Sequence, residues 1–317
     1  MKLQELYELA VDLGREADPR DEEEIEAVLR KEKEDFDKLD DQERERYDRD
    51  NLWNPYYDSR ILHGDPEAEV GSLMVGVDIS TGEVVLADRL RERGTEVDAL
   101  VGHHPHGKAS GHFYEVMHLQ ENELEHLGIG ITVAEGLFGP RIDEVMKKVH
   151  ARNHDQSVDA CRLMDIPFMC LHTPSDNQVQ TYLQKEFDQN EPERVKDIMD
   201  ILYGIPEYDR AARNNAGPKV FVGEKNKKAG KVVVDMTGGT SGPKEVYERL
   251  SQAGVGTIVG MHIPEENAKE AKKHHINVVI AGHMASDSLG LNLLVDKFEE
   301  RGVSIIPCSG FIRVNRS

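Results

Sequence analysis

Features that define several large functional classes are missing from this sequence. Among its 317 residues there are three cysteines and one tryptophan. The cysteines, Cys161, Cys170 and Cys308, are odd in number and form no C-x-x-C pair, so we expect reduced, buried thiols rather than a disulfide framework. No G-x-S-x-G turn is present and the cysteines have no obvious catalytic partner. The sequence therefore does not indicate covalent catalysis.

Long apolar runs and an excess of basic residues are also missing. No stretch of about 18 apolar residues occurs, so no membrane span is predicted. Residues 1–7 are amphipathic and lack the apolar core of a signal peptide, so we expect a cytoplasmic protein. Asp and Glu number 60 against 39 Lys and Arg, which gives a formal net charge of -21. Such a charge opposes nucleic acid and anionic membranes, so neither is expected as a general partner.

The N-terminal part of the chain, residues 1–54, is predicted to be an acidic helical extension. A one-sided apolar stripe predicts a helix over residues 1–17. Residues 20–50 are dense in charge but keep a sparse helical spacing, which predicts a solvated helix or a helical hairpin. This segment could instead pack on a partner subunit. Residues 51–68 are expected to be a loop.

The rest of the chain alternates between apolar, β-branched runs and amphipathic segments. This pattern is typical of an α/β fold, and it predicts two similar halves of mixed sheet flanked by helices, residues 55–190 and 191–317. We expect strands at 70–78, 97–101, 129–134, 167–171, 219–223, 231–235, 255–259 and 278–281, with a strand at 303–307 closing the sheet of the second half. Among the helices, one is predicted over 140–164.

Histidines follow two of the predicted buried strands. His103 and His104 come after the strand at 97–101, and His283 comes after the strand at 278–281 with Asp287 four residues later. Parallel sheets place ligands beyond the carboxyl ends of their strands. A buried imidazole needs a partner, and a metal ion binds several at once. At the start of a helix the spacing directs His283 and Asp287 the same way, although Asp287 could simply be an acid favoured by the helix dipole.

A third candidate follows the strand at 167–171. His172 and Asp176 are also four residues apart, but the proline between them favours a turn. Three imidazoles and two carboxylates suit two ions of Zn, Fe, Mn, Co or Ni better than Ca or Mg. The predicted metal ligands are His103, His104, Asp176, His283 and Asp287. His172 and His262 lie at strand ends nearby and are predicted to transfer protons.

A glycine-rich turn at 238–242 follows the strand at 231–235 and precedes a predicted helix. Its backbone N–H groups could hold an anion. It lacks the Lys-Ser/Thr ending of a P-loop, so a tight strand-to-helix turn without a ligand is at least as good an interpretation.

These motifs resemble those of the NIF-three-like proteins, which are often described as GTP cyclohydrolase type-two homologues. The family's His-His-Pro is matched at 103–105, its His-Thr-x-x-Asp at 172–176, and its closing Gly-His-x-x-x-Glu at 282–287. Its glycine-rich turn is matched at 238–242, and its strand-end Asp-x-Thr is similar to Asp-Ile-Ser at 78–80.

The resemblance extends over residues 55–312 and implies a NIF-three-like fold, a dinuclear metal centre and a ring-shaped homohexamer built as a trimer of dimers. It implies the same five metal ligands. Asp287 replaces the family's Glu, so its shorter arm could shift a bridging geometry. His262 replaces the Glu of a Thr-Gly-Glu and could add a polar contact facing the site. The acidic segment 20–50 is an addition relative to the family.

Two functions follow as hypotheses. The first is a metal-dependent hydrolase acting on a nucleotide, a pterin-like ring or another small anionic or heterocyclic substrate. The second is a non-catalytic metal protein: a regulator, a metal carrier or an assembly protein. An open coordination position distinguishes them, because a hydrolase keeps water on its metals and leaves room for a substrate.

Overall fold

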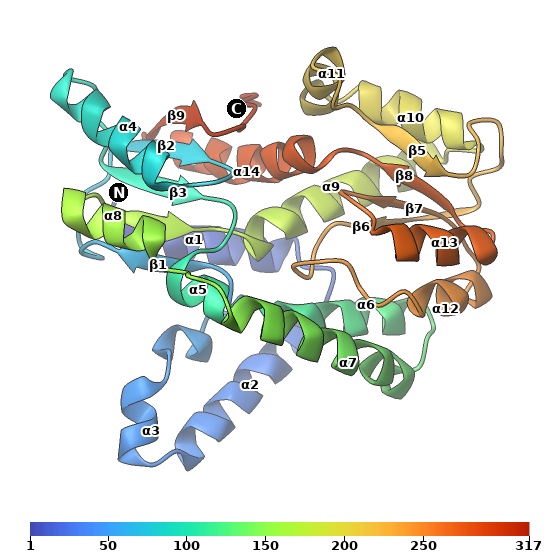
Figure 1. The fold of residues 1–317 in the computed structure, drawn as a ribbon, viewed down its shortest axis with the longest axis horizontal. Coiled ribbons are helices and arrows are strands. Elements are labelled where there is room, and N and C mark those ends of the chain that lie inside the picture. Colours follow the sequence, from blue (N-terminus) through green and yellow to red (C-terminus); the bar gives the residue numbers. More distant parts are fainter. Residues whose placement is uncertain (317) are drawn as a thin grey trace.

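Two separate sheets with helices packed against them make up residues 1–316, the part of the chain that the computed structural model describes. The five-stranded sheet has the order β1-β4-β3-β2-β9, and the four-stranded sheet has the order β5-β8-β7-β6. Figure 1 shows the first sheet on the left and the second on the right. Each sheet contains parallel and antiparallel pairs, so the predicted α/β fold with two mixed sheets is confirmed.

The first sheet has a buried parallel centre. Strands β2 (Ser72–Gly76), β3 (Ala99–Gly102) and β4 (Phe168–Cys170) run parallel, and all their residues are buried. Strand β1 (Arg60–His63) pairs antiparallel with β4. It lies in the segment expected to be a loop, and that expectation is wrong. Its sequence, Arg-Ile-Leu-His, contains only two apolar residues, and neither is fully buried. The strand therefore lacks the apolar run that marks the central strands of this sheet.

The last strand returns to the first sheet. The strand predicted at 303–307 exists as β9 (Ser304–Cys308), but it pairs in parallel with β2 rather than closing the second sheet. It follows α14 (His283–Glu299), which begins beside the second sheet. The order of elements along the chain therefore differs from their order in space, and local patterning contains no signal for this return.

The second sheet consists of β5 (Lys219–Val222), β6 (Lys231–Asp235), β7 (Val255–Gly260) and β8 (Asn277–Ile280). Strand β6 lies at its edge, beside α9 (Thr173–Asn190). The Gln184 side chain accepts from the backbone N–H of Val234 (3.0 Å) and donates to the carbonyl of Val232 (3.2 Å). The Gln180 Oε1 accepts from Met236 at 2.8 Å. These amides take the place of a neighbouring strand and satisfy an exposed edge.

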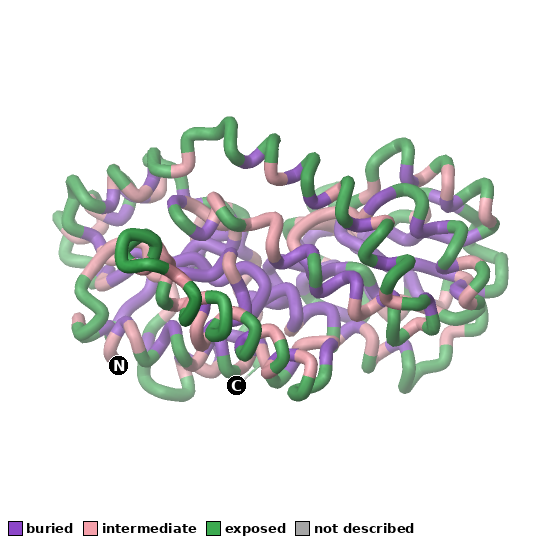
Figure 2. The backbone as a smooth tube through the Cα atoms, turned by 90° about the horizontal axis from the view of Figure 1, so that it is seen from below, coloured by how far each residue is buried: buried purple, intermediate pink, exposed green. Residues whose placement is uncertain are grey.

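Helices α9 and α14 pack together between the two sheets (Figure 1). Helix α14 contributes Leu291 and Phe298 to the core of the first sheet and Leu289 to the core of the second. The two helices approach closely at Gly290, where a Cβ atom would lie 2.3 Å from the Ser175 carbonyl oxygen. Figure 2 shows that the buried backbone gathers in the middle of the molecule.

The remaining helices cover the outside and one end. They are α1 (Leu3–Glu16), α2 (Glu22–Lys38), α3 (Asp41–Arg46), α4 (Thr81–Glu92), α5 (Gly107–Gly111), α6 (Leu119–His126), α7 (Ile131–His150), α8 (Gln156–Met164), α10 (Val195–Tyr203), α11 (Pro206–Arg213), α12 (Val246–Gln252) and α13 (Glu265–Lys273), with 3-10 turns η1 (Arg49–Leu52) and η2 (Phe113–His118). Within residues 1–316 no helix combines the length and apolar character needed to cross a membrane.

Two predictions for residues 129–164 are wrong. The strand expected at 129–134 is the start of α7. Ala134, Phe138 and Ile142 are buried at helical spacing and join the core beside the second sheet, so tertiary packing outweighs the short β-branched run. The single helix expected over 140–164 is interrupted, because α7 ends at His150 and α8 begins at Gln156.

The acidic N-terminal extension forms the predicted helices. Helix α1 packs into the core of the first sheet through Leu3, Leu6 and Tyr7. Helices α2 and α3 form a hairpin that projects from the body of the molecule (Figure 1). Asp21 and Asp40 cap their N-termini by accepting hydrogen bonds from the backbone three residues later.

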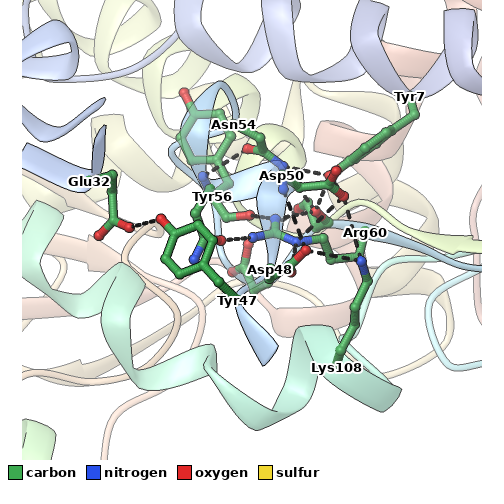
Figure 3. A network of polar contacts seen from close by, with 12 residues as sticks. Tyr7, Glu32, Tyr47, Asp48, Asp50, Asn54, Tyr56, Arg60 and Lys108 are labelled. Atoms are coloured by element: carbon green, nitrogen blue, oxygen red, sulfur yellow. Dashed lines mark hydrogen bonds and ion pairs between the residues drawn. The ribbon is translucent and has the colours of Figure 1, made fainter. Parts of the chain in front are cut away.

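A buried arginine joins the end of this hairpin to the first sheet (Figure 3). Arg60 is 1% exposed, and its Nε lies 2.7 Å from Asp48 Oδ2. It also donates to the Asn51 side chain and to the carbonyls of Tyr56 (2.6 Å) and Ser59 (2.7 Å). All its donors toward the core thus have acceptors, which is the condition for burying a guanidinium group.

Candidate metal centre

The predicted metal ligands follow the carboxyl ends of three strands. Two of these strands, β3 and β4, belong to the first sheet, and β8 belongs to the second. Strand β3 ends at Gly102, so His103 and His104 follow the strand and are not held on its opposite faces. His283 is the first residue of α14, and Asp287 lies one turn further along that helix. His172 precedes α9, and Asp176 lies in the first turn. The turn expected between His172 and Asp176 is wrong, because proline is compatible with the first turn of a helix.

Asp287 lies at the centre of the cluster and is fully buried. Its Oδ1 is 3.6 Å from His103 Nε2. Its Oδ2 is 3.7 Å from His104 Nε2 and 3.6 Å from His283 Nε2. Asp176 Oδ1 lies 3.4 Å from His103 Nε2. The structure therefore brings all five predicted ligands together, and the short arm of Asp287 still reaches histidines on two sides.

The donor atoms form three overlapping groups, each with its atoms within 4.8 Å of one another. They are His103 with Asp176 and Asp287, His104 with His283 and Asp287, and His103 with His104 and His172. Two donors that share a transition-metal ion at ~2.1 Å lie about 3–3.5 Å apart, so the observed distances are close to those of a ligand shell. That the five residues bind metal stays a prediction.

The buried carboxylates of Asp176 and Asp287 lack hydrogen-bond donors within the described chain. Asp176 Oδ1 and both carboxylate oxygens of Asp287 accept no hydrogen bond from residues 1–316. Burial, followed by the charges of Asp287 and Asp58, raises the pKa of Asp176 well above its ordinary value. Burial raises the pKa of Asp287 to about 7. Burying such groups without compensation is costly, and a divalent ion would supply it.

Two of the three predicted imidazole ligands, His103 and His283, are in the form that binds metals. Burial, followed by the neighbouring histidines, lowers the pKa of His103 well below its ordinary value. Burial likewise lowers the pKa of His283 to about 4. Both rings are therefore neutral near pH 7. Neutral imidazoles with ionisable carboxylates fit Zn, Fe, Mn, Co or Ni.

Two further aspartates orient the histidines from outside the cluster. His172 Nδ1 lies 2.8 Å from Asp58 Oδ2, and His104 Nδ1 lies 2.7 Å from Asp78 Oδ1. Burial alone would raise the pKa of Asp58, but hydrogen bonds from His172 and Thr173 outweigh it and lower that pKa. An ionised carboxylate only accepts, so each Nδ1 carries the proton and each Nε2 is free to bind.

Sequence reasoning missed Asp58 and did not recognise the role of Asp78. Asp58 lies in the segment expected to be a loop, 114 positions before His172, and no motif marks it. Asp78 is marked in the sequence only by the similarity of Asp-Ile-Ser at 78–80 to the family's Asp-x-Thr. A fully buried aspartate two residues before β1 could not be recognised because that strand was not predicted.

His262 lies beside the cluster and outside the three groups of potential ligands. Its Nδ1 is 3.0 Å from the Ser241 hydroxyl, and its ring centre is 5.2 Å from that of His283. A cavity of about 40 Å³ lies between His262 and the cluster. It is lined by His103, His172, Asp176, Thr237, His262 and His283. Both histidines predicted to transfer protons therefore border a space next to the cluster.

The glycine-rich turn fits the interpretation without a ligand. Gly238 and Gly239 have φ angles of +79° and +82°, which favour glycine. The Gln120 side chain donates to the carbonyls of Thr237 and Thr240, each at 3.1 Å, and so fixes the turn. Helix α12 begins only at Val246, so the turn does not open directly into a helix.

Comparison with known proteins identifies the family. No protein-family model and no curated protein matches the chain. Among solved structures, a NIF3 superfamily protein from Sphaerobacter thermophilus is 30% identical with a TM-score of 0.72, over 80% of this chain and 91% of that chain. The chain belongs to the NIF3 superfamily. This confirms the resemblance that the histidine motifs indicated.

Other solved structures match with lower similarity. Reduced HcgD from Methanocaldococcus jannaschii is 15% identical with a TM-score of 0.47, over 78% of this chain and 87% of that chain. A Bacillus cereus protein related to NIF3 is 11% identical with a TM-score of 0.41, over 82% and 91% of the two chains.

Proposed function

We propose that this NIF3 superfamily protein is a dinuclear metal-dependent hydrolase acting on a nucleotide or a similar small anionic or heterocyclic substrate. The observation that carries the proposal is the position of Asp287. Its two oxygens accept no hydrogen bond from residues 1–316 and face different histidines, and the cluster borders a cavity. A carboxylate in that position suits two ions better than one.

The ligand groups divide between two positions. His103 and Asp176 would hold one ion, His104 and His283 the other, and Asp287 would contact both. Two divalent ions so bound would acidify a water molecule and polarise a phosphoryl or amide oxygen. Asp58 and Asp78 keep the Nε2 atoms of His172 and His104 directed at the cluster.

The two remaining histidines would move protons in the cavity. His172 is held by Asp58 at Nδ1, which leaves Nε2 to take or give a proton at the substrate. His262 contacts Ser241 through Nδ1 and borders the same cavity. The cavity of about 40 Å³ that they border holds roughly three waters, and water reaching the proposed metals supports hydrolysis over metal carriage or a purely regulatory metal site.

Metal content tests the centre. We expect inductively coupled plasma mass spectrometry to find about two transition-metal ions per wild-type chain, since two ligand groups share Asp287. The variants Asp287→Ala and His104→Ala should lose most of this metal. The exposed residues Asp12 and His150 provide matched controls as Asp12→Ala and His150→Ala, which should retain it.

Absence of metal from wild-type protein, even after loading with Zn, Fe or Mn, would contradict the proposal. With metal bound, phosphoesters and cyclic nucleotides are the substrates to screen. His172→Gln and His262→Gln should lower turnover by about 10²–10⁴-fold without lowering metal content. A fully loaded protein that hydrolyses none of these would favour a carrier or a regulator.

The homohexamer implied by the family resemblance is also a proposal. Mass measurement of the protein in solution by light scattering tests it directly. Six chains per particle is the expected result.

A further inference from the structure

A second cavity of about 70 Å³ adjoins the one beside the metal cluster. It lies among α6, α12, β6 and β7. The two cavities share Gln120, Asp235, Ser241 and His262 in their linings. A ligand group in the second cavity would therefore lie next to the space that the metal cluster borders.

The polar lining of this second cavity consists mainly of hydrogen-bond acceptors. Gln120 is 5% exposed, and its Oε1 has no partner among the described residues because its amide group donates to the glycine-rich turn. Glu123 accepts a hydrogen bond from Gln180. Asp235, the last residue of β6, is exposed and lines the cavity. Neither lysine nor arginine is among the lining residues.

The carboxyl groups of Asp235 and Glu123 lower the stability of the fold when they are ionised. Burial raises the pKa of Asp235 from 3.8 to about 6. Burial, followed by the charge of Asp235, raises the pKa of Glu123 well above its ordinary value. Two neighbouring carboxyl groups with no lysine or arginine in the cavity lining do not stabilise each other. Such an arrangement is typical of a site where a ligand supplies the missing donors.

The walls of the cavity are apolar. They include Leu124, Phe138, Val246, Tyr247, Leu250 and Ile258. Since one water occupies about 10–15 Å³ of such a volume, the cavity has room for roughly five waters. That space suits one flat six-membered ring, with its faces on apolar side chains and its edge on the acceptors.

We propose that this cavity binds a six-membered nitrogen heteroaromatic ring through an edge that carries two adjacent N–H donors, with Asp235 as the principal acceptor. A carboxylate accepts two parallel N–H bonds, as it does from arginine. The partnerless Gln120 Oε1 would accept a further donor of the exocyclic amino group. An ammonium ion is a poorer fit, because a strongly hydrated point charge loses its water among apolar walls.

The inference deepens the proposed function and rests on it in one respect. A ring held here would direct its substituent past His262 toward the metal cluster, and so would define the substrate class of the hydrolase. Binding of the ring itself needs no metal, so the two proposals can fail separately.

Two isomeric pyrimidines test the proposal by calorimetric titration of the metal-loaded protein at pH 8. Isocytosine presents two adjacent N–H donors, whereas cytosine presents a donor beside an acceptor. We expect isocytosine to bind at least about tenfold more tightly than cytosine, because cytosine leaves a buried acceptor unpaired. Equal affinities, no binding of isocytosine, or tighter binding of methylammonium would overturn the proposal.

The variant Asp235→Asn should abolish the preference for isocytosine, since an amide supplies one acceptor and one donor. The exposed Asp12→Asn should keep the preference. Asp287→Ala should also keep it while losing metal, which separates failure of the ring site from failure of the metal centre. If Asp287→Ala loses metal and the isomers bind wild type equally, only the ring site is contradicted.

Thermal unfolding distinguishes ligand recognition from a structural role. The folded-state pKa of Asp235 is raised, so the unfolded state releases its proton first and stability falls as pH rises from about 4 through about 6. Asp235→Asn and Glu123→Gln should therefore unfold at higher temperature than wild type at pH 8 and at about the same temperature at pH 4. A lower unfolding temperature at pH 8 would assign these acids to the fold and contradict the proposal.

Discussion

Replacing Gly290 with alanine is expected to separate α9 from α14 and to lower metal binding at the proposed centre, although the substitution does not touch its ligands. The new Cβ would lie 2.3 Å from the Ser175 carbonyl oxygen and 2.7 Å from its hydroxyl. A helix backbone cannot rotate away, so one helix must move. Ser175 directly precedes Asp176, and Gly290 lies three residues after Asp287. A shift of either helix therefore separates the two buried carboxylates.

Overpacking of this kind costs about 1–3 kcal/mol or more of unfolding free energy. Urea unfolding and metal content of Gly290→Ala, measured together, check both parts of the prediction. Gly136→Ala is the matched control, because Gly136 lies within α7 and a Cβ there meets nothing within 4 Å. The control should be neutral or slightly stabilising. Full metal content and unchanged stability in Gly290→Ala would show that the helices tolerate the methyl group.

Replacing Arg60 with methionine is expected to lower the unfolding free energy by about 3–5 kcal/mol, the cost of removing one partner from a buried charged network. The substitution removes the buried ion pair to Asp48, which then keeps only Lys108, and it removes one donor each from the carbonyls of Tyr56 and Ser59 (Figure 3). It also loosens the segment that holds Asp58 against His172.

Chemical denaturation of Arg60→Met measures this loss. Arg89→Met removes an exposed pair with Glu92 on α4 and should cost at most about 1 kcal/mol. A similar cost for the two variants would mean that the Arg60 network contributes no more than a surface ion pair.

Local patterning predicted the centre of the fold and the cluster of ligands. His103, His104 and His283 each follow a fully buried apolar strand or open the helix after it, and that information lies within ten residues of each motif. The resemblance to NIF-three-like proteins rested on the same short segments. His103, His104 and Asp176 follow two parallel strands of the first sheet, and α14 brings His283 and Asp287 to them from the end of β8 in the second sheet.

The parts that could not be predicted depend on distant residues. Strand β1 has little apolar patterning and forms because β4 lies beside it, more than 100 positions later in the chain. Asp58 becomes recognisable only once His172 is placed next to it. The second cavity arises where α6 and α12 meet β6, and no continuous stretch of sequence encodes the grouping of its acceptors.

The return of β9 to the first sheet affects how the protein is made. Strand β2 pairs with β9, which is synthesised more than 200 residues later. His283 and Asp287 also come late in the chain. Domains generally fold as units while they leave the ribosome, N-terminal parts first. Here the first sheet stays incomplete until residues 304–308 have been synthesised. A chain that stops before α14 should therefore lack the outermost strand as well as His283 and Asp287, so metal bound at the proposed centre would mark a chain that has been synthesised beyond α14.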